Sequence, residues 1–199
     1  MEKQKTKKVN ESIVNKDMVN KGSVISSERV KMLVLTGMFT AMLSIMAQIV
    51  IPIQPIPFSL SLFAIFLTGA LLPPRYAFLS ILSYILLGAF GVPVFAGFKG
   101  GFHVLTNMTG GYIASYPLMG LITSYSYKIT SKRKTLFLTI GMVLSLLVCY
   151  ALGTLWFTYV SGTGFIKALS ICVIPFVPFD LLKLILAVTV SSIIRKTIR

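Results

Sequence analysis

The sequence predicts an all-α membrane protein, a compact bundle of six transmembrane helices with both termini in the cytoplasm. Of its 199 residues, 55% are hydrophobic and only 12% are charged, whereas a soluble domain carries about 25% charged residues. Acidic residues nearly vanish after Val30, where Asp180 is the only one. A soluble domain could not bury so much apolar surface, so lipid must be the solvent.

The chain divides into two predicted regions. Residues 1–29 form a basic cytoplasmic tail, expected to be disordered, without an apolar stretch long enough for a signal-peptide core. Residues 30–199 form the membrane domain, whose apolar runs approach the roughly 20 residues that cross a bilayer. The predicted helices are Leu33–Ile51, Phe58–Leu72, Tyr76–Phe90, Gly111–Tyr127, Leu136–Val160 and Ala168–Ile194. The second and third are short, and the third could begin at the Pro73-Pro74 pair.

Lysines and arginines set the orientation of these helices through the positive-inside rule. With the N-terminus inside, sixteen of these residues fall on the cytoplasmic side, whereas Lys99 and Lys167 fall outside. Both termini are therefore expected in the cytoplasm, and the protein is expected as a multi-pass protein of a bacterial plasma membrane. The basic residues lie in short segments between apolar runs, so nucleic-acid binding is not expected.

Two irregular stretches lie on the predicted external side, the proline-bearing residues 52–57 and the glycine-rich residues 91–110. Irregular backbone at membrane depth is tolerated only where it lines a protein cavity. Together the stretches predict a pocket that opens outward, with loops able to cover it.

Asp180 and Lys183 are the strongest candidates for a site. Their spacing of three residues places both side chains on one helix face, and Pro175 and Pro178 start or kink that helix. A charge at mid-membrane costs about 2.5–3.5 kcal/mol, so it usually faces a cavity or a partner. Contact with a ligand is favoured over two alternatives, a structural ion pair and a lysine that reaches for the membrane interface.

The external stretch offers further candidates. Gly97, Gly100 and Gly101 allow the backbone to approach a ligand closely, and Lys99 between them could bind an anion. The alternative is a flexible loop with a solvated lysine, and spacing alone does not separate the two.

Thr109 and Tyr112 open the fourth helix and offer a hydroxyl and a phenol, although tyrosines also anchor helices at the interface. On the first helix, Gly37 and Ala41 form a small-residue face that permits close helix packing. This face could pack against another helix of the same chain or dock to a second membrane protein, and the sequence leaves both open.

Missing features exclude several classes of protein. The chain lacks a Gly-x-x-x-x-Gly-Lys-Ser/Thr phosphate loop, so it cannot hydrolyse ATP through that motif. Cys149 and Cys172 lie in apolar runs, as expected of small buried residues. His103 has no second histidine or cysteine nearby that could bind a metal with it. No metal site or cofactor is therefore expected. One membrane acid without a nucleophile and base argues against an intramembrane enzyme.

Five ordered motifs carry a resemblance to a known family. The chain resembles the BioY family, the biotin-binding S components of energy-coupling factor (ECF) transporters, from about Leu33 to Arg195. The motifs are Pro55–Leu60, Gly88–Gly101, Thr109–Tyr112, Gly153–Trp156 and Pro175–Lys183.

The resemblance implies a six-helix bundle that binds biotin near its external face. Asp180 and Lys183 would contact the ligand, Tyr112 and the Gly97–Gly101 loop would line the pocket, and the face around Gly37 would meet a transmembrane T component. Two ABC-type ATPases would supply the energy. The alternatives are an S component for thiamine or riboflavin, and a non-catalytic assembly protein in which the charged pair only clamps helices.

The chemistry of biotin agrees with this implication. Its ureido ring has two N–H donors and a carbonyl acceptor, and its valerate chain ends in a carboxylate. Asp180 is assigned to a ureido N–H, an interaction strengthened by the charge. Lys183 and Lys99 both stay candidates for the ligand carboxylate.

Overall fold

A computed structural model describes residues 27–51, 58–129 and 134–197. By backbone contacts the chain divides into two units, residues 1–35 and 36–199. The described part of the first unit is helical. The predicted loop at 52–57 and most of the predicted tail lie outside the described residues.

The described residues are mostly helical, and most helices follow the predicted apolar runs. Phe58 and Ser59, predicted to begin the second helix, form a short strand instead. Among the described residues, three helices are long and apolar enough to cross a membrane, judged by length and composition: Ser27–Gln48, α6 and α8. The elements after the first helix are β1 (Val50–Ile51), β2 (Phe58–Ser59), α2 (Ser61–Leu71), α3 (Pro74–Ala89), α4 (His103–Thr106), α5 (Gly110–Ile129), α6 (Lys134–Ser161), α7 (Phe165–Cys172) and α8 (Val177–Thr197).

The start of α3 confirms the role expected of the double proline. Pro74 is its first residue and Pro73 caps it with an extended backbone. Proline suits this position because its missing N–H would have no partner in a first helical turn.

The predicted bounds of the sixth helix, Ala168–Ile194, are wrong, whereas the expectation that Pro175 and Pro178 start or kink the helix is confirmed. The structure has two helices there, with α7 ending at Cys172 and α8 beginning at Val177. Pro175 lies in the turn between them and Pro178 is the second residue of α8. Because proline cannot donate a helical hydrogen bond, the break falls at this pair. Asp180 thereby enters the first turn of α8.

A short pairing of strands replaces the predicted end of the first helix. The helix ends at Gln48, and Ile51 pairs with Phe58 while Val50 pairs with Ser59 in an antiparallel ladder. The pairing brings Phe58 and Ser59 to the start of α2. A run of apolar residues does not distinguish a strand from a helix over so short a length.

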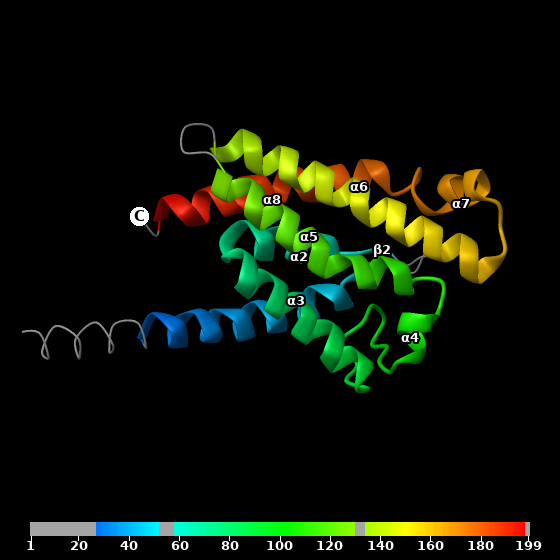
Figure 1. Ribbon diagram of the computed structural model, residues 1–199, viewed down its shortest axis with the longest axis horizontal. Helices are drawn as coiled ribbons and strands as arrows, with labels where there is room; N and C mark the ends of the chain where they lie inside the picture. Colours follow the sequence, from blue (N-terminus) through cyan, green and yellow to red (C-terminus); the bar gives the residue numbers. More distant parts are fainter. Residues whose placement is uncertain (1–26, 52–57, 130–133, 198–199) are drawn as a thin grey trace, which may run out of the picture. The chain divides into compact units, whose positions relative to one another are not determined.

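In the second unit, α5 packs against α6, α3 and α2, and α2 also packs against α8 (Figure 1). Small residues allow the close approach of α5 and α6. A Cβ atom added to Gly111 would lie 2.2 Å from Cβ of Trp156, and one added to Gly153 would lie 2.2 Å from the Tyr112 ring. Hydroxyl groups also join helices, as in the 2.7 Å bond from Ser124 Oγ to the Leu72 carbonyl, which is a common form of contact between membrane helices.

Candidate functional site

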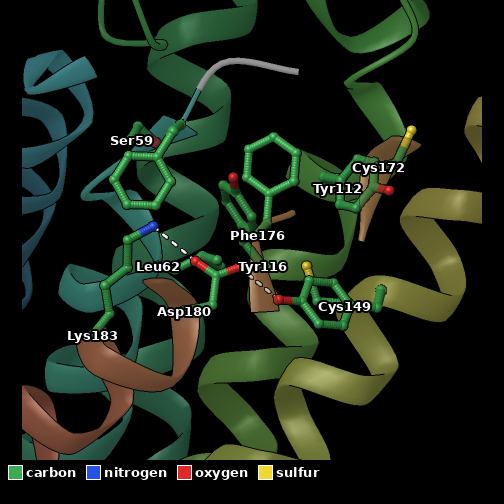
Figure 2. A pocket seen from close by; sticks show the side chains of 11 residues that line it. Ser59, Leu62, Tyr112, Tyr116, Cys149, Cys172, Phe176, Asp180 and Lys183 are labelled. Carbon is green, nitrogen blue, oxygen red and sulfur yellow. Dashed lines mark hydrogen bonds and ion pairs between the residues drawn. The ribbon is translucent and has the colours of Figure 1, made fainter. Parts of the chain in front are cut away.

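A cavity lies where β2 and the helices α2, α5, α6, α7 and α8 converge (Figure 2). Its open space measures about 60 Å³, which is room for a few water molecules. Aromatic and apolar side chains make most of the wall, and a few polar groups point into it. The lining residues are Phe58, Ser59, Leu62, Tyr112, Tyr116, Cys149, Tyr150, Cys172, Phe176, Asp180 and Lys183.

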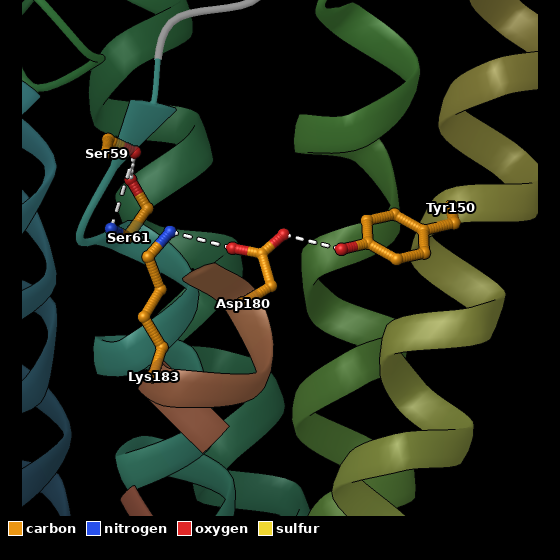
Figure 3. A network of polar contacts seen from close by, with 5 residues as sticks. All are labelled: Ser59, Ser61, Tyr150, Asp180 and Lys183. Carbon is orange, nitrogen blue, oxygen red and sulfur yellow. Dashed lines mark hydrogen bonds and ion pairs between the residues drawn. The ribbon is translucent and has the colours of Figure 1, made fainter. Parts of the chain in front are cut away.

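The charged pair of α8 lies in this wall. Lys183 Nζ donates to Asp180 Oδ1 over 2.8 Å, and the two residues are 4% and 2% exposed. The carboxylate also accepts a 2.7 Å bond from the Tyr150 hydroxyl at its other oxygen, Oδ2 (Figure 3). The position of Asp180 in the first turn of α8 favours the negative charge, because backbone N–H groups point toward the start of a helix.

The carboxylate has acceptor capacity that the described residues do not use. Two carboxylate oxygens offer about four acceptor sites, and among the described residues Lys183 and Tyr150 occupy one each. The sequence left open whether Asp180 and Lys183 form a structural ion pair or contact a ligand. In the structure they form an ion pair that also borders a cavity.

The ammonium group of Lys183 is held from a second side by an aromatic ring. Its Nζ lies 3.7 Å from the ring centroid of Phe58, a favourable cation–π geometry. Phe58 in turn packs edge-on against Phe179, with ring centroids 5.1 Å apart. The ladder between β1 and β2 brings Phe58 here, so a strand contributes to a site that the sequence placed on helices.

Two serines lie where β2 meets α2, and Figure 3 shows them with the charged pair. The hydroxyls of Ser59 and Ser61 lie 2.7 Å apart and share a hydrogen bond. Ser59 lines the cavity and Ser61 is buried at the start of α2.

Tyr112, predicted as a site residue, lines the same cavity from α5. Its hydroxyl shares a 3.2 Å hydrogen bond with Thr154 Oγ1 of α6. Tyr116, one helical turn later, also lines the cavity. The structure thus brings together Asp180, Lys183 and Tyr112 of the predicted set.

The other predicted residues lie on the stretch between α3 and α5 and do not line this cavity. Lys99 is exposed and exchanges backbone hydrogen bonds with Phe95. Gly97 and Gly101 have φ of 75° and 101°, conformations that few other residues adopt. At Gly100 an added Cβ would lie 2.6 Å from the Val92 carbonyl oxygen. Thr109 acts through its backbone, because its carbonyl accepts from Tyr112 N at 3.2 Å at the start of α5.

Gln48 fixes the stretch that carries Lys99. Its Oε1 accepts from the Phe98 N–H at 2.9 Å, and its Nε2 donates to the Pro93 carbonyl at 3.3 Å. Phe98 itself has a positive φ of 57°, which is uncommon for a residue with a side chain. The side-chain bond from Gln48 helps to hold that conformation.

The predicted docking residues lie on an open helix face. Gly37 and Ala41 are both exposed, and a Cβ atom added to Gly37 would meet no atom within 4 Å. The described part of the chain therefore does not use this face for close packing.

Sequence reasoning missed most of the wall. Tyr150 lies in a uniformly apolar run, where nothing in the sequence distinguishes it from its neighbours. Cys149 and Cys172 are predicted to be small buried residues, and the structure confirms that both are buried. The spacing of Tyr112 and Tyr116 by one helical turn was an available signal for a shared face. Tyr150, by contrast, is identified only by its contact with Asp180.

The arrangement suits a neutral polar group with apolar surroundings. One carboxylate can accept N–H donors, one ammonium group retains two of its three N–H donors after bonding Asp180, and aromatic rings provide flat apolar walls. Pockets for small molecules have this form, mostly apolar with a few placed polar groups.

Comparisons with known proteins agree with the sequence motifs. The model of the BioY family matches residues 15–199. A probable biotin transporter BioY of Pyrococcus horikoshii is 39% identical over 158 residues, covering 79% of this chain and 92% of that protein. The biotin transporter BioY of Thermotoga maritima is 38% identical over 169 residues, covering 83% and 96%. A crystal structure of the S-component for biotin from an ECF-type ABC transporter superposes with a TM-score of 0.80 at 27% identity, covering 85% of this chain and 93% of that one.

Proposed function

Because this chain belongs to the BioY family, we propose that it is the biotin-binding membrane subunit of a vitamin uptake transporter. The observation that carries the proposal is the buried Asp180–Lys183 pair in the wall of an otherwise apolar cavity. The protein is a transport subunit rather than an enzyme. Biotin is its transported ligand and not a cofactor.

In the proposed complex, the ureido ring of biotin enters the buried end of the cavity. The free acceptor sites of Asp180 receive a ureido N–H, and Lys183 donates to the ureido carbonyl. Phe58, Leu62 and Phe176 enclose the sulfur-containing ring. The open space of about 60 Å³ is smaller than such a ligand, so entry requires lining side chains to move. Phe58, stacked on the Lys183 ammonium group, is the one that shields the polar pair.

The carboxylate of biotin is assigned to Lys99. Its charge is costly to bury without a partner, so it stays at the wetter end of the ligand. Lys99 is exposed on the stretch fixed by Gln48, whereas the Lys183 ammonium group already has a carboxylate partner. Gly97, Gly100, Gly101 and Thr109 then shape this end of the site through the backbone.

A titration of the purified full chain against biotin, thiamine and riboflavin tests the proposal. We expect biotin to bind with a dissociation constant below about 1 μM and the other two vitamins to bind at least 100-fold more weakly. Isothermal titration calorimetry measures all three. Tight binding of thiamine or riboflavin without binding of biotin overturns the substrate assignment.

The role of Lys99 is tested with biotin and biotinamide, which lacks the ligand's negative charge. Lys99→Gln is expected to weaken biotin binding about tenfold, the loss of one charge-assisted hydrogen bond, and to leave biotinamide binding unchanged. Lys167→Gln, another loss of a cation in the described chain, is the matched control. Equal losses for both ligands contradict the assignment.

For the whole transporter we propose six membrane-spanning segments, with α7 and α8 sharing the sixth, both termini in the cytoplasm, and a location in the bacterial plasma membrane. Biotin is captured from outside. A transmembrane T component and two ABC-type ATPases deliver it inward. The support is the charge distribution of the sequence and the likeness to the S-component of an ECF-type transporter.

The open face at Gly37 and Ala41 is proposed to dock the T component. Gly37→Leu is expected to leave biotin affinity unchanged, because no atom lies within 4 Å of the added Cβ, and to abolish co-purification of a co-expressed energising module. Close packing of membrane helices depends on such small residues. Pull-down through a tag on this chain measures the assembly, and unchanged recovery of the module contradicts the docking proposal.

A further inference from the structure

Two cationic side chains contact one aromatic ring, that of Tyr127, at an end of the second unit. The guanidinium carbon of Arg195 lies 3.3 Å from the ring centroid of Tyr127, and Lys134 Nζ lies 5.5 Å from the same centroid. The three residues come from the last turns of α5, the first residue of α6 and the last turns of α8. Figure 1 shows these helix ends on the same side of the unit.

This cluster has no carboxylate to balance it among the described residues. Their only acids are Glu28, in the other unit, and Asp180. Asp180 already bonds Lys183 and Tyr150, and it precedes Arg195 by fifteen residues on α8, about 22 Å along a helix. Both cations contact the same ring, and like charges in one neighbourhood favour the binding of an anion beside them.

Arg195 supplies an independent sign that a partner belongs here. Its Nε atom is buried and has no hydrogen-bond partner among the described residues. A buried donor without an acceptor is costly. The contact of the guanidinium carbon with the Tyr127 ring, 3.3 Å from its centroid, also restricts the orientation of the Arg195 side chain.

The chemistry of these groups selects a phosphate. A guanidinium fork binds two oxygens of a phosphate side by side, and an ammonium group adds a third contact. The cluster lies at the ends of α6 and α8, helices that are long and apolar enough to span a bilayer by length and composition. The ends of such helices are expected at the depth of the phospholipid head groups. Basic pockets between membrane helices bind anionic head groups.

We propose that Tyr127, Lys134 and Arg195 form a binding site for the phosphate of an anionic phospholipid head group. The ring orients the fork of Arg195, and the two cations share the negative charge. The site is separate from the cavity around Asp180 and does not depend on what that cavity binds.

Native mass spectrometry of the full chain in detergent, titrated with phosphatidylglycerol or phosphatidylcholine, tests the proposal. The double variant Lys134→Gln, Arg195→Gln is expected to weaken phosphatidylglycerol binding by about tenfold or more, since each cation near an anionic lipid accounts for about fivefold. Phosphatidylcholine binding, weaker at the start, is expected to change less than twofold.

The matched control is Lys128→Gln, Lys196→Gln, which removes the same charge from two exposed residues close by in the sequence. It is expected to change phosphatidylglycerol binding less than twofold. Equal losses in the two double variants mean general attraction to a basic surface and overturn the site. No loss in the first double variant also overturns it.

Two further experiments test the site even if the double variant is unstable. Tyr127→Phe keeps the ring and is expected to retain lipid binding, whereas Tyr127→Leu is expected to lose it; the same result for both overturns the role of the ring. Inorganic phosphate is expected not to displace phosphatidylglycerol, and displacement at millimolar phosphate means a free-anion site instead. Variants that keep the lipid but lose a co-expressed energising module point to an acidic protein partner and overturn the lipid proposal.

Discussion

Asp180→Asn is expected to lower the affinity for biotin by roughly 100-fold, the largest effect of any single substitution in the cavity. The change removes the charge that strengthens the hydrogen bond to the ureido N–H, a bond to a charged group being worth about 1.5–3 kcal/mol. It also leaves the buried Lys183 ammonium group, 4% exposed, without its carboxylate partner. Isothermal titration calorimetry measures the affinity.

The same variant separates a binding pocket from a structural clamp when its thermal unfolding is followed too. Breaking one side of a buried ion pair destabilises a fold by about 3–5 kcal/mol, whereas replacing both partners with apolar residues is often neutral. The double variant Asp180→Leu, Lys183→Met is therefore expected to recover the stability lost in Asp180→Asn and still not bind biotin. If Asp180→Asn binds biotin as tightly as the unchanged protein, the pocket assignment fails.

Gly153→Val is expected to reduce both stability and biotin affinity through the packing of α5 on α6. An added Cβ would lie 2.2 Å from the Tyr112 ring, so the ring must shift, and Tyr112 lines the cavity. Overpacking of a tight contact costs about 1–3 kcal/mol. Loss of one well-placed wall contact lowers affinity by about tenfold, or about 1.4 kcal/mol.

Gly164→Val is the matched control for this substitution. Its Cβ meets no atom within 4 Å, and its φ and ψ of −61° and 145° suit a residue with a side chain. Unfolding followed by fluorescence and a biotin titration are carried out on both variants. A loss of affinity in Gly164→Val as large as in Gly153→Val refutes the explanation through Tyr112.

Much of the fold was predictable because apolar runs mark membrane helices directly. The short second and third runs became α2 and α3, and the double proline gave the start of α3. Pro175 and Pro178 indicated that a helix starts or kinks there, but both sides of the break are equally apolar, so the end of α7 at Cys172 was not predictable. The pairing of β1 with β2 depends on residues that meet through tertiary contact, which a local pattern does not encode.

The site was predictable where charge stood out from its surroundings. Asp180 and Lys183 are conspicuous in an apolar run, and the structure places both in the cavity wall. Tyr150 and Phe58, which hold the carboxylate and the ammonium group, resemble any other membrane aromatic in the sequence. Their roles come from the fold, because each reaches the pair from a different element.

The pairing of Asp180 with Lys183 also has an electrical consequence. A single charge that crosses the membrane potential changes the free energy by about 2.3 kcal/mol per 100 mV. The two residues lie one helical turn apart and bear opposite charges, so together they carry no net charge through the field. The membrane voltage therefore does no net work on this pair if its depth in the bilayer changes, whereas Lys99 and the ligand carboxylate carry charges of their own.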